Sequence, residues 1–227
     1  MVYKVNSLFE KTSRNNSVEL VGTIVGEPKY NHEVLGEKFY KGYIGVCRKS
    51  NYVDNIPFIV SSRLVDVGTL KIGMCIRVYG EYHSYNRKVL ECEKSKLDLF
   101  VFCSEIDEVK NTHEINDILL NGYICKEPIY RETPLGRQVC DLLIAINGTY
   151  GKSQYIPCIC WGRNALYSSS LKVGTKIKLK GRIQSREYNK KLDEEMNEKR
   201  IAYEVSVCSI YDVKQDIQEL NENRGGH

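Results

Sequence analysis

The chain has 227 residues, of which 42% are apolar and 27% are charged, a composition typical of an ordinary folded globular protein. This length suffices for one large domain or for two small ones of about 100 residues each. No apolar run approaches the roughly 20 residues needed to cross a bilayer, and the first residues lack the apolar core of a signal peptide. We therefore expect a cytoplasmic protein with no membrane partner.

The net charge of +4 is modest, but the charges are unevenly distributed along the chain. Residues 126–191 hold 13 Lys and Arg against 4 Asp and Glu, whereas residues 192–227 hold 4 against 9. The chain thus has a basic segment followed by an acidic segment, which the small net charge does not reveal. Nucleic-acid-binding proteins carry basic patches of this kind.

Nine cysteines are scattered through the chain, most of them in strand-like runs, and neither they nor the four histidines have a spacing that suits zinc. Secreted disulfide scaffolds carry paired cysteines in short chains. We therefore expect reduced thiols, most of them buried as small hydrophobic side chains, and neither a metal nor another cofactor.

Two copies of one sequence unit account for most of the chain. Residues 18–30, VELVGTIVGEPKY, recur 100 residues later at 118–130 as ILLNGYICKEPIY, and the match continues without a gap to Arg63 and Arg163. Self-similarity at a fixed offset indicates a tandem repeat. We expect a lead-in, a first copy, a second copy and a polar tail, at residues 1–15, 16–112, 113–213 and 214–227.

Each copy predicts five strands. A long first strand is broken by Gly22 or Gly122, and a Leu-Gly turn leads into the second strand. A short helical connector separates the third strand from the fourth, and a long charged loop joins the fourth to the fifth. We expect the connectors at 63–70 and 163–171 and the loops at 82–96 and 186–200.

This layout of five strands, with one connector after the third, is that of the OB-fold barrel. The predicted fold class is therefore all-β, with two tandem five-stranded OB-fold barrels. A generic five-stranded barrel or sandwich would give the same pattern and stays open at this point.

The stretch from Tyr150 to Tyr188 combines aromatic rings with a cationic strand. From Lys176 to Ile183, cationic residues alternate with apolar ones, which indicates a strand with one face in a core and one charged face. The only tryptophan, Trp161, falls at the end of the preceding strand. Bases stack on such rings while Lys and Arg follow the phosphates, so the stretch favours unpaired nucleic acid as a partner. The alternative is a basic solvent face, with Trp161 in the core.

Five segments of the second copy form one pattern, namely ILLNG at 118–122, PLG at 134–136, IPCICWG at 156–162, LKVG at 171–174 and KGRIQSREY at 180–188. In these segments the second copy resembles the bacterial single-stranded DNA-binding protein family. The resemblance is dense over residues 116–213 and, through the repeat, looser over 16–110. It implies an OB-fold and a non-enzymatic protein that binds single-stranded DNA with little sequence preference in replication, recombination or repair.

The resemblance implies a set of DNA-binding residues in the second copy. In the family, bases stack on aromatic residues at set places, which fall here on Tyr150, Tyr155, Trp161 and Tyr188. The cationic residues that we expect to contact phosphates are Arg137, Arg163, Lys178, Arg182 and Arg186.

The first copy departs from this pattern, because Ser61, Asn55 and Arg87 stand where the second copy has rings. We therefore expect either a weaker DNA site or a mainly structural and assembly domain. Four aromatic residues nearby could compensate in part, namely Tyr52, Phe58, Tyr82 and Tyr85, and of these Tyr52 and Tyr85 are DNA-binding candidates.

Family members usually end in an acidic tip that recruits replication and repair proteins, and residues 216–227 hold no such tip. An alternative function is therefore a primosome-accessory or protein-interaction module with weak nucleic-acid binding, like primosomal replication protein N.

An enzyme is disfavoured, because the carboxylates of the basic segment are not clustered as a metal site requires.

The family commonly works as four OB units, so two units per chain predict a homodimer.

Overall fold

The structure is a computed structural model that describes residues 15–87, 96–110, 113–148, 152–191 and 197–212. Within them the chain forms two compact units. The amino-terminal unit comprises Ser17–Ile118 and Arg182–Val205, and the carboxyl-terminal unit comprises 15–16, Leu119–Gly181 and 206–212. No helix in this part of the chain is long and apolar enough to span a membrane.

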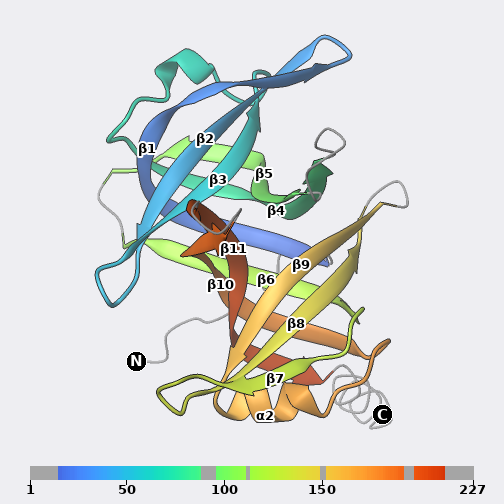
Figure 1. The fold of residues 1–227 in the computed structure, drawn as a ribbon. Coiled ribbons are helices and arrows are strands. Elements are labelled where there is room, and N and C mark those ends of the chain that lie inside the picture. Colours follow the sequence, from blue (N-terminus) through green and yellow to red (C-terminus); the bar gives the residue numbers. More distant parts are fainter. Residues whose placement is uncertain (1–14, 88–95, 111–112, 149–151, 192–196, 213–227) are drawn as a thin grey trace, which may run out of the picture. The chain divides into compact units, whose positions relative to one another are not determined.

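Five strands close into a barrel in the amino-terminal unit (Figure 1). Their order is β2-β3-β5-β4-β1, and β1 also pairs with β2. The strands β3 and β5 run parallel, whereas β2–β3 and β4–β5 are antiparallel. The elements are β1 (Asn16–Val34), β2 (Glu37–Cys47), β3 (Val53–Ser61), the 3-10 helix η1 (Val67–Thr69), β4 (Cys75–Arg87) and β5 (Lys96–Glu108).

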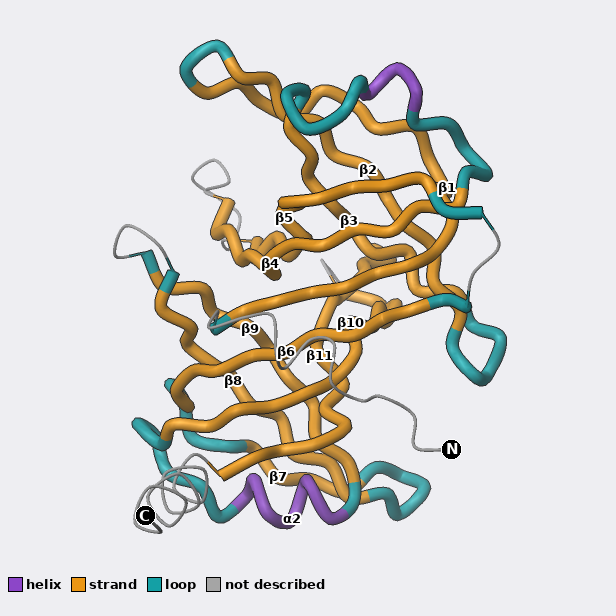
Figure 2. Tube along the Cα trace, turned by 180° about the vertical axis from the view of Figure 1, so that it is seen from behind, coloured by secondary structure: helices purple, strands orange, loops and turns teal. Residues whose placement is uncertain are grey.

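In the carboxyl-terminal unit the strands follow the order β6-β10-β11-β9-β8-β7, and β8 also pairs with β6. The helix α2 packs against β7, β8 and β9 across one end of these strands (Figure 2). The elements are β6 (Ile115–Ile124), β7 (Ile129–Glu132), β8 (Gln138–Asn147), β9 (Ser153–Trp161), α2 (Arg163–Ser169), β10 (Lys176–Lys191) and β11 (Asn197–Asp212).

The repeated glycine of each first strand lies where two backbones approach closely. Along β1 the pairing changes from β4 to β2 at Thr23, directly after Gly22. A Cβ atom on Gly22 would lie 2.3 Å from the carbonyl oxygen of Gly45, and one on Gly122 would lie 2.4 Å from that of Ala145. Any side chain at these two positions would collide with the neighbouring backbone, so glycine is required there. The predicted break is wrong, because β1 and β6 continue through Gly22 and Gly122.

The predicted connectors are confirmed as η1 and α2, but the predicted loops at 82–96 and 186–200 are wrong in extent. Strand β4 continues to Arg87, and β10 continues to Lys191 before β11 begins at Asn197. Polar composition suggested loops, yet a hairpin ladder is held by backbone hydrogen bonds and does not require apolar side chains. The outer half of the β10–β11 hairpin, within Arg182–Val205, belongs to the second sequence copy but packs in the amino-terminal unit. The boundaries of the compact units therefore do not coincide with those of the sequence copies.

Candidate nucleic-acid interface

The outer face of β9 carries two exposed aromatic rings. Ile156, Cys158 and Cys160 point inward and are buried, whereas Tyr155 and Trp161 lie on the other face with 42% and 39% of their surface exposed. This alternation is that of a strand with one face in the core. The alternative of a core tryptophan is therefore wrong, because Trp161 lies on the outer face.

Between the two rings, this face carries both apolar and charged groups. Pro157 pairs with Leu143 of β8, and both are partly exposed. Ile159 is buried and pairs with Asp141, whose exposed carboxylate forms an ion pair with Arg131. Six residues of extended strand place Tyr155 and Trp161 about 20 Å apart along β9. The outer face of β9 therefore offers one stacking ring near each of its ends.

A third ring, which the sequence analysis missed, extends this face. Tyr123 of β6 pairs with Ala145 of β8, which pairs on its other side with Tyr155. Tyr123 is 41% exposed, and the ammonium group of Lys176 lies 6.0 Å from the centroid of its ring. Tyr123 and Tyr155 thus stand on either side of the small Ala145 side chain. Because Gly122 faces inward, strand alternation places the next residue, Tyr123, on the outer face, so the sequence could have identified this ring.

Three of the predicted cationic residues lie in this same unit. Arg137 is exposed in the turn between β7 and β8, and Arg163 is exposed at the first residue of α2. Lys178 is partly exposed on β10 between Ile177 and Leu179, which are buried as the alternation predicted. The predicted stacking residue Tyr150 lies outside the described residues.

The other predicted residues lie in the amino-terminal unit. Tyr188 is 38% exposed on the outer half of β10, and the guanidinium group of Arg186 lies 5.9 Å from its ring centroid. Tyr85 is 61% exposed on β4. Tyr52 is 42% exposed, and the guanidinium group of Arg48 lies 4.7 Å from its ring centroid.

Arg182, the remaining arginine that was predicted to contact phosphate, binds the completely buried carboxylate of Asp54. Asp54 of β3 accepts hydrogen bonds from Arg48, at 2.6 and 2.8 Å, and from Nη2 of Arg182 at 3.0 Å. It also accepts from the backbone N–H of Ser185 at 2.7 Å and from its hydroxyl at 3.0 Å. Burial raises the pKa of Asp54, but the hydrogen bonds from Arg48 and Ser185 outweigh this and hold that pKa below its ordinary value. The Asp54 cluster therefore fixes β10 to β3 within the amino-terminal unit.

In the first sequence copy, the positions without rings make contacts within the chain. Ser61 donates a hydrogen bond to Glu37, whose carboxylate also lies 3.4 Å from Arg63. The carbonyl oxygen of Asn55 accepts a hydrogen bond of 3.0 Å from the hydroxyl of Tyr203. These two positions of β3 thus serve the stability of the amino-terminal unit.

Two of the aromatic residues considered as substitutes in the first copy are core residues. Phe58 and Tyr82 are fully buried, so the expectation that they could compensate is wrong. Both occupy inward-facing positions of their strands, as the burial of their alternate neighbours shows.

The described cysteines form no disulfides, and among the described residues no group of three or more His, Cys, Asp or Glu side chains could hold a metal ion. Burial raises the pKa of Cys160 to about 11, so its thiol stays protonated near neutral pH. The expected burial holds for only half of these cysteines. Cys103, Cys140, Cys158 and Cys160 are buried, Cys75 and Cys125 are partly exposed, and Cys47 and Cys208 are exposed.

A closed five-stranded barrel with a short helical segment between its third and fourth strands defines an OB-fold protein, and the fold is all-β. The Single-strand binding protein family matches residues 115–211. The matched residues include both strands of the β8–β9 face.

Individual curated relatives match part of the chain. The chain is 33% identical over 81 residues to single-stranded DNA-binding protein 2 of Listeria innocua, covering 33% of this chain and 51% of that protein. It is 32% identical over 81 residues to single-stranded DNA-binding protein A of Bacillus subtilis, covering 33% and 47%. The chain thus spans about half the length of these curated relatives.

Among solved structures, the wild-type single-stranded DNA binding protein from Thermus aquaticus superposes with a TM-score of 0.65 at 20% sequence identity. The match covers 87% of this chain and 92% of the other. At this identity the likeness concerns the fold.

Proposed function

We propose that the chain binds single-stranded DNA with little sequence specificity through the outer face of β8 and β9. The observation that carries the proposal is the exposure of Tyr155 and Trp161 on the same outer face of β9. The rings give sequence-tolerant stacking, because every base has a π-face. The match of this part of the chain to the single-strand binding protein family supports the same function.

Cationic side chains of the same unit supply the phosphate contacts in this proposal. Arg137 and Arg163 are exposed near the Trp161 end of β9, and Lys178 adds a third positive charge on β10. Tyr188 and Arg186, on the outer half of β10, are further DNA-binding candidates and lie in the amino-terminal unit. The role follows from this chemistry: the protein protects or organises single-stranded DNA during replication, recombination or repair.

Binding of the full chain to oligo-dT is expected to weaken as salt rises, with a slope of log K against log salt near −0.7 for each neutralised phosphate. Arg163→Ala should reduce the magnitude of that slope by about 0.7, because it removes one phosphate contact. Fluorescence anisotropy of labelled DNA at several salt concentrations measures both quantities.

The repeat offers a matched control for this experiment. Arg63 is the counterpart of Arg163 in the first copy and already lies 3.4 Å from Glu37, so Arg63→Ala should leave the slope unchanged. A salt-independent affinity in the unmodified chain would contradict the proposal and favour a protein-interaction module.

We also propose that the chain forms a homodimer. Two sequence copies in each chain give four in a dimer, and closed two-fold symmetry is the commonest arrangement of soluble oligomers. Light scattering at micromolar concentration is expected to give about twice the chain mass of 26.1 kDa. A mass that stays at that of one chain across the concentration range would show the proposal to be wrong.

A further inference from the structure

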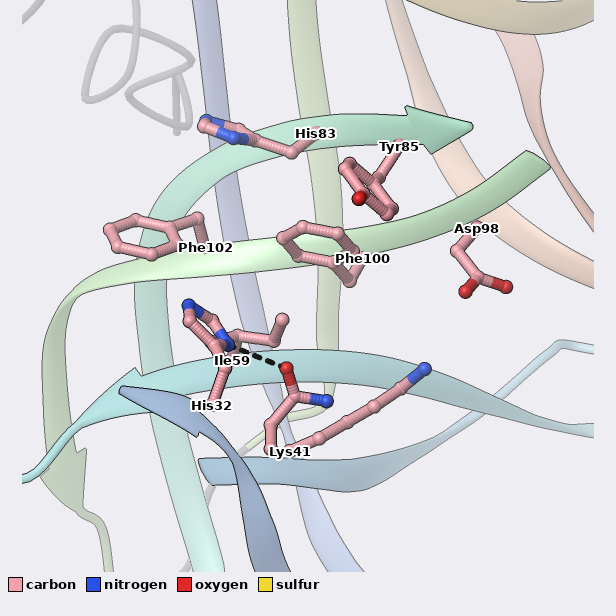
Figure 3. A pocket seen from close by; sticks show the side chains of 9 residues that line it. His32, Lys41, Ile59, His83, Tyr85, Asp98, Phe100 and Phe102 are labelled. Atoms are coloured by element: carbon pink, nitrogen blue, oxygen red, sulfur yellow. Dashed lines mark hydrogen bonds between the residues drawn. The ribbon is translucent and has the colours of Figure 1, made fainter. Parts of the chain in front are cut away.

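The amino-terminal unit contains a groove walled by aromatic rings, outside the residues that match the family. It lies between β4 and β5 on one side and β2, β3 and the end of β1 on the other, and its volume is about 500 Å³ (Figure 3). Pockets of this size hold small ligands in many proteins. The lining side chains are Asn31, His32, Lys41, Ile59, His83, Tyr85, Asp98, Phe100 and Phe102.

Strand alternation explains why the rings gather on one wall. Phe100 and Phe102 are two residues apart on β5 and flank the fully buried Val101, so both lie on the outer face. His83 of β4 pairs directly with Phe100, and its ring stacks on that of Phe102 with 5.4 Å between centroids. The 61% exposed ring of Tyr85 continues this wall at the outer end (Figure 3).

These contacts hold the wall in place before any ligand arrives. The ring of Phe102 also lies 5.8 Å from that of Phe39, and the ring of His83 lies 5.9 Å from that of Phe100. Rings that are packed against one another lose little conformational freedom when a further ring stacks on them, and this lowers the cost of binding.

The charges in the groove suit a base better than a phosphate. Its charged side chains are Lys41 and Asp98, which balance in formal charge. A phosphate would require an excess of positive groups, whereas an uncharged flat heterocycle needs ring faces and apolar surface, which Phe100, Tyr85 and Ile59 provide. Polar groups at the edge, such as those of Asn31 and His32, can pair with the edge of a base.

We infer that this groove is a second nucleic-acid site, in which a nucleobase of the bound single strand stacks on the wall formed by Phe100, Phe102 and Tyr85. The inference rests on the proposed single-stranded DNA binding of the chain. In the first copy, Ser61 and Asn55 of β3 make contacts within the chain, whereas the rings of the groove wall lie on β4 and β5.

Photo-crosslinking of the full chain locates the bases directly. The probe is an oligo-dT of about 30 nucleotides, long enough for two OB units, in which 5-iodouracil replaces several thymines. After irradiation, mass spectrometry of the peptides is expected to identify adducts on Tyr85 or within 97–103, in addition to adducts in the carboxyl-terminal unit.

Affinity measurements provide the second readout. The double variant Phe100→Leu/Phe102→Leu keeps apolar side chains but removes both rings, and we expect it to bind oligo-dT about five-fold or more weakly. Tyr30→Leu is the matched control, because Tyr30 is an exposed ring of the β1–β2 hairpin that packs on Tyr40 and does not line the groove. It should bind like the unmodified chain.

The outcomes separate this inference from the function on which it rests. Adducts confined to the carboxyl-terminal unit, together with unchanged affinity of the double variant, would overturn the groove site and leave the proposed function intact. Failure of the unmodified chain to bind oligo-dT would overturn both. Adducts in the groove that disappear in the double variant would support it.

Discussion

Asp54→Ala is expected to destabilise the amino-terminal unit by about 3–5 kcal/mol, because it leaves two arginines without their buried counterion. The Asp54 side chain is fully buried, and it accepts the charged hydrogen bonds of Arg48 and Arg182. Chemical denaturation followed by circular dichroism measures the change in unfolding free energy. Hydrogen exchange should also accelerate at the amide of Ser185, which donates to this carboxylate.

An exposed Arg–Asp pair in the same chain provides the control. Arg131 and Asp141 lie 2.9 Å apart, with side chains that are 47% and 40% exposed. Solvent-exposed pairs contribute about 0–1 kcal/mol, so Asp141→Ala should be nearly neutral. If Asp54→Ala cost as little as Asp141→Ala, the Asp54 cluster would not stabilise the unit.

The stabilisation by Asp54 should depend on pH in one direction. The folded-state pKa of Asp54 is lowered, so the ionised group stabilises the fold above its unfolded-state pKa of about 3.9. This contribution is lost as the pH falls through the lower folded-state pKa. The difference in melting temperature between the unmodified chain and Asp54→Asn should therefore be constant near neutral pH and shrink below about pH 4.

Trp161→Ala is expected to weaken binding to oligo-dT by about 1–3 kcal/mol, which is a rise in Kd of about 5- to 150-fold. The ring lies on the outer face of β9, so its loss should lower the melting temperature only slightly. Trp161→Phe keeps a stacking ring at the same place and should recover most of the affinity. Unchanged affinity in Trp161→Ala together with a collapsed melting temperature would mean that the ring acts in folding alone.

Much of the fold could be predicted because its signals are local. The alternation around Ile177, Leu179 and Ile183 and the repeated Gly22 and Gly122 depend only on neighbouring residues and on strand geometry. The extent of the hairpins could not be predicted in the same way, because a backbone ladder forms with polar and charged side chains as well as with apolar ones.

The Asp54 cluster lay beyond sequence reasoning for a different reason. Its partners Arg182 and Ser185 are 128 and 131 residues away in the chain, and only the tertiary fold brings them to β3. The basic strand suggested that Arg182 faces a phosphate, and nothing local indicates a buried carboxylate beside it. By contrast, the alternation of Phe100, Val101 and Phe102 is a local signal that could have located the aromatic wall of the groove.

Titration of the intrinsic fluorescence of the chain with oligo-dT tests the central claim most directly, because Trp161 is the only tryptophan. If bases stack on the outer face of β9, the emission should be quenched as DNA is added and should reach a plateau at a fixed ratio of nucleotides to protein. Quenching should diminish as salt is raised, since phosphate contacts hold the strand in place. Emission that does not change at saturating DNA and low salt would contradict stacking on Trp161 and, with it, the proposed binding face.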